Sequence, residues 1–93
     1  MATHTVKVPL KQPGTPHKFE PSNISVKKGD SVEWVNEDTQ QHTVTSDDGG
    51  VILNGKLAGK GDKYSHTFSD AGDVPYHCEI HGSMTGVVNV TPK

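Results

Sequence analysis

Glycine and proline recur so often along this chain that helices of ordinary length have little room. The longest stretch that contains neither residue runs from Asp30 to Asp48. This stretch is rich in β-branched residues, whose side chains fit a pleated strand better than a helix. The distribution of these two residues therefore predicts an all-β protein.

Short runs of alternating or β-branched residues mark the predicted strands. Turn-forming residues separate the runs, for example at positions 28–30 and 47–50. Short strands at this spacing favour an antiparallel β-sandwich or barrel. The segment 51–60 fits either an irregular strand or a loop over one sheet edge, and the sequence does not decide between them. The predicted strands contain Val6/Val8/Leu10, Ile24/Val26, Val32/Trp34, Thr43/Val44/Thr45, Tyr64/His66/Phe68, Tyr76/Cys78 and Val88/Val90.

Length and charge narrow the possible functions. We expect one domain over residues 1–93, with a thin core, because so short a chain buries only about 60–65% of its unfolded surface. The net charge of -2 and the scattered lysines offer no basic face, so we expect no nucleic-acid partner. No apolar run approaches the roughly 18 residues that cross a membrane, so we expect no stable membrane insertion. The single cysteine excludes an internal disulfide.

Residues 76–84, Tyr-His-Cys-Glu-Ile-His-Gly-Ser-Met, gather donors that suit a soft metal ion. Cys78 is the only cysteine of the chain, and Met84 is one of two methionines. His81 lies between them, so a thiolate, an imidazole and a thioether fall within one short segment. The glycines at 82 and 86 predict a tight loop, from which the side chains of His81 and Met84 can turn back toward the cysteine sulfur.

Strand alternation separates two neighbouring donors of this segment. If residues 76–78 end a strand, Tyr76 and Cys78 point to one face and His77 points to the other, because side chains alternate with period two. His77 and Cys78 therefore cannot share a metal ion within one chain.

A second histidine is needed for a copper site of the electron-transfer kind. Such a site uses two imidazoles and one thiolate in a nearly trigonal plane, with a weak axial thioether. His42 is the best candidate, since it follows a polar turn and opens a β-branched strand. A histidine on a neighbouring strand would tie the Cys78 loop to the scaffold, and a rigid site limits the reorganisation needed at each electron transfer.

Two segments, VEWVNEDTQQHTVTS and YSHTFSDAGDVPYHCEIHGSMTGVVNV, resemble the small type 1 (blue) copper proteins, the cupredoxins of the amicyanin and plastocyanin kind. The motif Cys-x2-His-x2-Met is joined there to an upstream Asn-x5-His-Thr-Val. The short gap between His81 and Met84 is similar to the amicyanin loop. The resemblance covers the chain from Phe19 onward and is loose over the first 18 residues and over 49–62.

This resemblance implies a Greek-key β-sandwich of about eight strands and a soluble carrier of one electron, rather than an enzyme. It implies one type 1 copper ion that cycles between Cu(II) and Cu(I), redox partner proteins, and an extracytoplasmic location for a mature chain without its signal peptide. It also implies that a backbone amide just after the first histidine lies near the cysteine sulfur. We expect a monomer. The copper ligands that the resemblance implies are His42, Cys78, His81 and Met84.

Three alternatives remain open at this point. A copper delivery or storage protein would bind Cu(I) through exposed soft ligands. A type 2 copper site shared between subunits would use His77. A cysteine-nucleophile enzyme would need an accessible Cys78 beside an oriented base, which an inward-facing cysteine fits poorly. Zinc prefers four strong ligands, and a thioether is not one of them.

The remaining polar side chains have more ordinary interpretations. We interpret His4, His17 and His66 as structural or surface histidines. Thr43 and Asn36 are candidates for groups that orient the metal ligands. Four acidic residues are candidates for a rim that faces a basic partner, namely Glu37, Asp38, Asp47 and Asp48.

Overall fold

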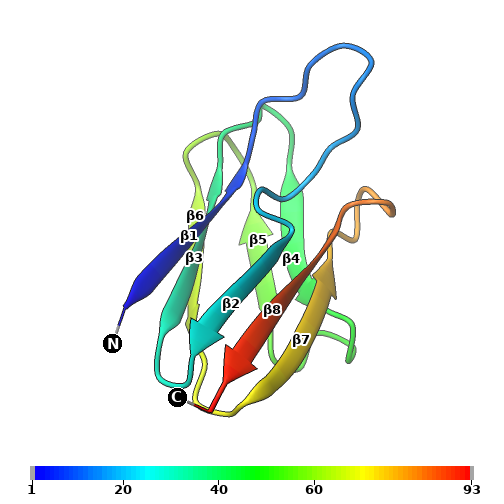
Figure 1. Ribbon diagram of the computed structural model, residues 1–93. Helices are drawn as coiled ribbons and strands as arrows, with labels where there is room; N and C mark the ends of the chain where they lie inside the picture. The colour runs from blue at the N-terminus through cyan, green and yellow to red at the C-terminus, as the bar shows by residue number, and fades with distance from the viewer. Residues whose placement is uncertain (1, 93) are drawn as a thin grey trace.

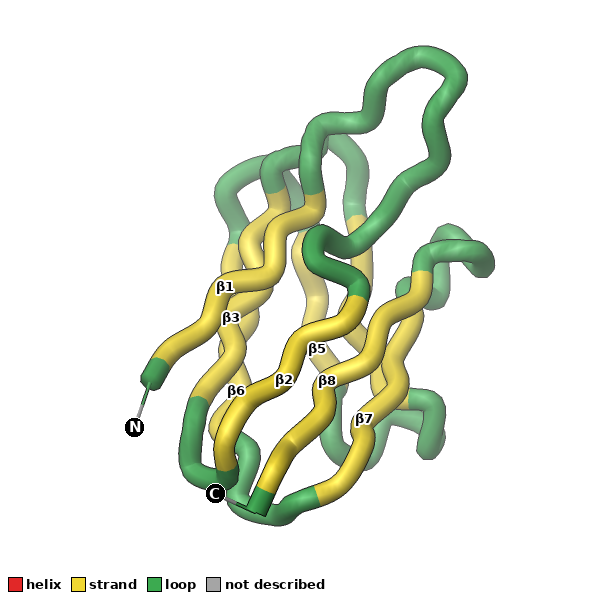
Figure 2. Tube along the Cα trace, viewed as in Figure 1, coloured by secondary structure: helices red, strands yellow, loops and turns green. Residues whose placement is uncertain are grey.

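The computed structural model describes residues 2–92, so the two ends of the predicted domain, positions 1 and 93, lie outside it. Over these residues the chain folds into eight strands and forms no helix (Figure 1). This arrangement confirms the all-β prediction, and Figure 2 shows how loops connect the strands at both ends of the molecule. The strands are β1 (Thr3–Val8), β2 (Asn23–Lys27), β3 (Ser31–Asn36), β4 (His42–Ser46), β5 (Asn54–Leu57), β6 (Lys63–Thr67), β7 (Gly72–His77) and β8 (Thr85–Thr91).

The strands form two sheets that pack as a sandwich. One sheet has the order β1-β3-β6 and the other β2-β8-β7-β4-β5. The expected sandwich is confirmed, and the expected antiparallel pairing fails in two pairs, since β1 with β3 and β2 with β8 are parallel. The physical reason is connectivity: after β1 the chain crosses to the other sheet as β2 and returns as β3, so β3 runs in the direction of β1.

The core lies between the sheets and follows the alternation of each strand. In β3, for example, Val32, Trp34 and Asn36 are buried while the residues between them are partly exposed. Four large side chains of this core, those of Phe19, Trp34, Phe68 and Tyr76, are all buried. The rings of Phe19 and Trp34 both pack edge-on against Tyr76, at centroid distances of 4.8 and 5.4 Å.

The ambiguous segment 51–60 contains both predicted alternatives. Residues 54–57 form β5, which pairs with β4 at the edge of the larger sheet. The flanking residues are loops, and Val51 and Ile52 are exposed. The fully buried side chains of Leu53 and Leu57 anchor this edge to the core.

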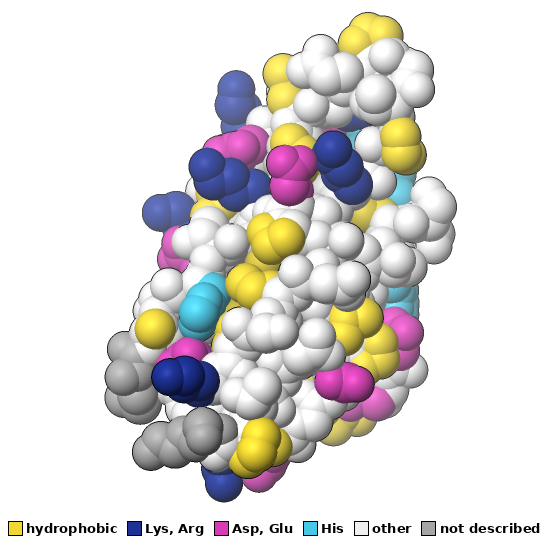
Figure 3. Space-filling model, viewed as in Figure 1, with side chains coloured by type: hydrophobic (Ala, Val, Ile, Leu, Met, Phe, Trp, Pro, Cys, Tyr) yellow, Lys and Arg dark blue, Asp and Glu magenta, His cyan; other side chains and the backbone are white. Residues whose placement is uncertain are grey.

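Strand direction brings distant segments of the chain to one end of the sandwich. β4 begins there, β7 ends there, and the β7–β8 loop and the long β1–β2 loop lie at the same end (Figure 1). We call this the ligand end; the described termini and the β2–β3 turn lie at the far end. Within residues 2–92 there is no helix of the length and hydropathy that crossing a membrane requires. On the face seen in Figure 3, acidic and basic side chains are interspersed.

Candidate metal centre

Cys78 follows β7 directly, and the strand sets the direction of its side chain. Tyr76 and Cys78 are fully buried, whereas His77 is only half-buried. The Nδ1 atom of His77 hydrogen-bonds with Oδ1 of Asp47 at 2.6 Å, on the other side of the strand. The predicted separation of His77 from Cys78 is therefore confirmed.

The cysteine sulfur lies between two imidazole nitrogens. Cys78 Sγ is 3.9 Å from Nδ1 of His42 and 3.7 Å from Nδ1 of His81. When a nitrogen donor and a sulfur donor bind the same ion at ordinary bond lengths in a trigonal plane, the two donor atoms are about 3.8 Å from each other. The two nitrogen-to-sulfur separations therefore fit a single copper ion, and the donor set matches the one that such a site needs.

The loop after Cys78 is held by its own backbone. The amide of Cys78 donates to the carbonyl of Met84 at 2.9 Å, and the amide of Met84 donates to the carbonyl of His81 at 2.9 Å. These bonds close the short loop that the spacing predicts and bury the Met84 side chain. All four residues predicted as ligands therefore lie at the ligand end.

Thr43 ties the ligand loop to β4. Its backbone amide donates to Cys78 Sγ at 3.4 Å, which agrees with the expectation of an amide near the cysteine sulfur. Its hydroxyl accepts a hydrogen bond of 2.8 Å from the amide of Glu79. A hydrogen bond to sulfur lowers the electron density that the thiolate offers a metal, so this amide tunes the site as well as positioning it.

Asn36 holds the turn before His42 through hydrogen bonds to the backbone. Its Nδ2 group donates to the carbonyl of Gln40 at 2.9 Å, and its Oδ1 accepts from the amide of Asp38 at 2.9 Å. The side chain is fully buried. Asn36 therefore orients His42 through the shape of the turn.

Asp38 is buried rather than part of an acidic rim, so that interpretation is wrong for this residue. Only 2% of it is exposed, and its Oδ2 atom lies 2.9 Å from Nε2 of His42. Burial acts to raise the pKa of Asp38, but hydrogen bonds from His42 and from the amide of Thr39 outweigh burial and hold that pKa below its ordinary value. These contacts therefore favour the ionised form of Asp38 beside His42.

His17 also reaches this site, which its interpretation as a structural or surface histidine did not include. Its Nδ1 lies 3.1 Å from Oδ2 of Asp38, and its ring lies on the ring of His81, with centroids 3.9 Å apart and planes inclined by 32°. Potential donor atoms of His17, His42 and His81 all lie within 4.8 Å of one another. One feature of the topology could have placed His17 near His42, because the loop that follows β1 lies at the end of the sandwich where β4 begins.

The environment of His81 favours a neutral imidazole, which is the form that binds a metal. Burial lowers the pKa of His81, and the neighbouring His17 lowers it further, while Asp38 acts in the opposite direction. His81 is only half-buried, whereas His42 is fully buried. Of the two imidazoles beside the sulfur, His81 is thus the one that meets solvent.

The other two histidines have the structural contacts that their positions predict. His4 hydrogen-bonds with Asp30 at the far end, and His66 packs edge-on against Phe68 with ring centroids 4.7 Å apart. Burial lowers the pKa of His66. Neither residue belongs to the histidine group that could hold a metal within residues 2–92.

Comparison with known protein sequences gives one family and several relatives. Residues 6–91 match the family described as copper binding proteins, plastocyanin/azurin family. Amicyanin of Paracoccus denitrificans is 38% identical over 76 residues, an alignment that covers 78% of this chain and 58% of that protein. Plastocyanin of Scenedesmus fuscus is 32% identical over 83 residues, covering 77% of this chain and 85% of that protein. The chain thus spans little more than half the length of the amicyanin that it matches.

Comparison with solved structures supports the fold. A purple cupredoxin from Nitrosopumilus maritimus superposes with a TM-score of 0.85 over 95% of this chain and 99% of that chain, at 24% identity. A Cu(I) form of an amicyanin variant superposes with a TM-score of 0.74 over 96% of this chain and 82% of that chain, at 33% identity. The arrangement of two sheets is therefore that of a cupredoxin sandwich.

Proposed function

Because this chain belongs to the plastocyanin/azurin family of copper-binding proteins, we propose that it carries single electrons on one type 1 copper ion. The observation that carries the proposal is the placement of Cys78 Sγ at 3.9 and 3.7 Å from two imidazole nitrogens. When bound there, copper supplies one-electron chemistry by alternating between Cu(II) and Cu(I). The proposed ligands are His42, Cys78, His81 and Met84.

The residues around the proposed ion are held by burial and by hydrogen bonds to the backbone. Cys78 and His42 are fully buried and Met84 is 1% exposed, so water is excluded from most of the site. β4 carries His42 and the amide of Thr43, while the loop bonds between Cys78 and Met84 fix the other side. Donors held in this way do not rearrange when the charge of the site changes, which keeps electron transfer fast.

His81 gives the proposed site its route to partners. It is the half-buried member of the set, and Ile80 beside it is exposed. We propose that redox partner proteins dock at the ligand end and exchange electrons through the edge of this ring. We also propose that the protein acts as a monomer outside the cytoplasm.

Burial of the donors favours an electron carrier over the alternatives. A nucleophilic cysteine must be reached by its substrate, but Cys78 is fully buried. Delivery or storage of copper calls for exposed, exchangeable ligands, but of the four proposed ligands only His81 has appreciable exposure. These two observations support a carrier that is not an enzyme.

Titration of the metal-free protein with Cu(II) tests the proposal. We expect one equivalent to produce an intense thiolate-to-copper absorption at about 600 nm. The colour should disappear on reduction with ascorbate and return on oxidation with ferricyanide, through several cycles. Tight binding of Cu(II) without the band, or colour that does not survive one redox cycle, would exclude the proposed function.

A further inference from the structure

One buried carboxylate oxygen contacts two imidazoles at the ligand end. Oδ2 of Asp38 lies 2.9 Å from Nε2 of His42 and 3.1 Å from Nδ1 of His17. An ionised carboxylate only accepts hydrogen bonds, so each of these ring nitrogens carries a hydrogen. When neutral His42 carries its ring hydrogen on Nε2, the lone pair of Nδ1 is free to bind a metal ion. Nδ1 is the atom that faces Cys78 Sγ.

The same carboxylate reaches the second imidazole indirectly. His17 comes from the long β1–β2 loop, and its hydrogen bond to Asp38 fixes the ring while that ring lies over His81. The side chain of His17 is only 12% exposed, so it is packed rather than free in solvent. His17 thus covers one face of the most exposed imidazole of the site.

We propose that Asp38 and His17 are positioning residues of the metal centre: Asp38 fixes the ring of His42 directly and the ring of His81 through His17, and its charge favours Cu(II) over Cu(I). The electrochemical part of this inference rests on the proposed function. The structural part concerns only the arrangement of the rings and is tested on the protein without metal.

Two physical effects lead to the preference for Cu(II). A carboxylate that accepts the other ring N–H of a ligating histidine raises the basicity of that histidine, and removing such a partner typically costs about 10–100-fold in metal affinity. A buried negative charge also attracts Cu(II) more strongly than Cu(I), because Cu(II) has the larger charge. Both effects lower the reduction potential.

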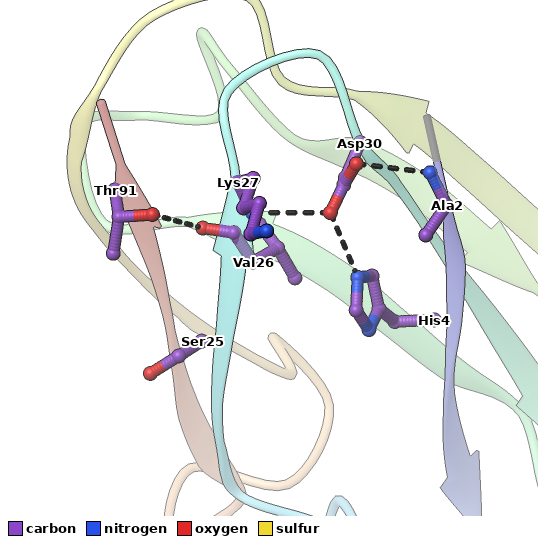
Figure 4. Close-up of a pocket in the computed structure, with 7 residues that line it drawn as sticks. All are labelled: Ala2, His4, Ser25, Val26, Lys27, Asp30 and Thr91. Carbon is purple, nitrogen blue, oxygen red and sulfur yellow. Dashed lines mark hydrogen bonds and ion pairs between the residues drawn. The ribbon is translucent and has the colours of Figure 1, made fainter. Parts of the chain in front are cut away.

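The far end of the sandwich offers a matched control. Asp30 also has a buried carboxylate that is hydrogen-bonded to a histidine. Its Oδ2 lies 3.0 Å from Nε2 of His4 (Figure 4). Its other hydrogen bonds come from the backbone amides of Ala2 and Lys27. Asp30→Asn removes the same charge from the same kind of cluster. The contacts of Asp30 do not include any of the proposed ligands.

Nitrogen-15 NMR of the metal-free protein at about pH 8, where histidine is ordinarily neutral, tests the structural part. The expected spectrum has the ring hydrogen of His42 on Nε2 and that of His17 on Nδ1. A hydrogen on Nδ1 of His42, or a solvent-averaged mixture of the two tautomers, would overturn the proposal whether or not copper is ever carried.

The reduction potential tests the charge. We expect Asp38→Asn to reduce the affinity for Cu(II) relative to Cu(I) about tenfold, which raises the potential by about 59 mV, while Asp30→Asn leaves it nearly unchanged. Equal shifts in the two variants would show a general effect of charge and overturn the role of Asp38. Should Asp38→Asn fail to fold, the NMR experiment on the unaltered protein still decides.

Copper release tests His17. His17→Phe keeps a flat ring over His81 but loses the hydrogen bond to Asp38, whereas His17→Ala loses both. We expect a chelator to remove Cu(II) several-fold faster from His17→Ala than from the unaltered protein. His17→Phe should lie between the two, because it keeps a ring over His81 but loses the bond through which Asp38 fixes that ring. An unchanged rate in His17→Ala would overturn the role of His17 as a cover for His81.

Discussion

The two ends of the sandwich each hold a buried aspartate beside a histidine, yet the two carboxylates have different partners. At the far end, Asp30 accepts hydrogen bonds from two backbone amides as well as from His4. At the ligand end, Asp38 contacts the rings of His17 and His42 and accepts one backbone hydrogen bond, from the amide of Thr39. The first carboxylate therefore fixes mainly backbone, and the second fixes mainly side chains that face the metal site.

The two aspartate–histidine contacts are similar in kind, but this difference means that their loss should affect different properties of the protein. Loss of a partner that holds backbone weakens the strand ends, so it should appear as lower stability. Loss of a partner that holds an imidazole should appear in the properties of bound copper. The predictions below test whether stability and copper chemistry separate in this way.

The largest effect is expected where a donor atom itself is replaced. Cys78→Ser should abolish the absorption band of the Cu(II) protein while the fold remains, because a hydroxyl is a harder and poorer donor than a thiolate. His77→Ala should keep nearly the full band, because His77 points away from the site toward Asp47. Absorption spectra of the two copper-loaded variants check this prediction, and a colourless His77→Ala protein would contradict the strand alternation at Cys78.

A packing change near the ligand end should lower stability without altering the colour. In Gly86→Ala the new methyl group would lie 2.5 Å from the phenol ring and hydroxyl of Tyr76 and 2.9 Å from the carbonyl of Ser22. Such overpacking costs about 1–3 kcal/mol. Urea denaturation of the metal-free protein measures the loss.

Gly59→Ala is the control for this packing change, because nothing lies within 4 Å of the added carbon. Its free energy of unfolding should stay within about 0.5 kcal/mol of the unaltered value. Loss of colour in Gly86→Ala would mean that stability and copper chemistry depend on position in the fold rather than on bonding partners.

Much of this arrangement could be predicted from the sequence, because local patterns encode it. Alternation placed Tyr76 and Cys78 inside and His77 outside, and the β-branched run after His42 located β4. The short spacing from Cys78 to Met84 indicated a closed loop, and the backbone bonds of that loop are present. These features depend on residues close together in the chain.

The His17 contacts could not be predicted, because they depend on long-range folding. The contact of Asp38 with His42 is local, and it depends on how the turn between these two residues folds. His17 lies in a segment that only loosely resembles other cupredoxins, 21 residues from Asp38. An acidic residue in a polar turn is ordinarily exposed, and the neighbouring sequence does not indicate that Asp38 contacts two imidazoles. The parallel pairing of β1 with β3 has the same origin, since it follows from a crossover between sheets.

A moderate effect is expected for the proposed axial ligand. Met84→Leu removes a weak thioether donor but keeps an apolar side chain in the buried position. The band should persist and the reduction potential should rise, because Cu(II) gains more than Cu(I) from an additional donor. Voltammetry and absorption measure the two quantities together, and complete loss of copper from a folded Met84→Leu protein would mean that Met84 is a strong ligand.

The smallest expected effect is a pH dependence of stability that belongs to the far end. Hydrogen bonds from the amide of Ala2, from His4 and from the amide of Lys27 hold the pKa of Asp30 well below its ordinary value of 3.8. A carboxyl group whose pKa is lower in the folded state contributes stability above its unfolded pKa, and loses this contribution as the pH falls toward the folded pKa. The stability advantage of the unaltered metal-free protein over Asp30→Asn should therefore be full at about pH 6 and shrink as the pH is lowered below about 4.

Urea midpoints at several pH values measure this difference, and because both proteins share every other acidic group, the comparison isolates Asp30. An advantage that stays constant down to about pH 3 would show that Asp30 acts through its shape and not its charge. The two ends would then differ in the chemistry of the carboxylate itself as well as in its partners.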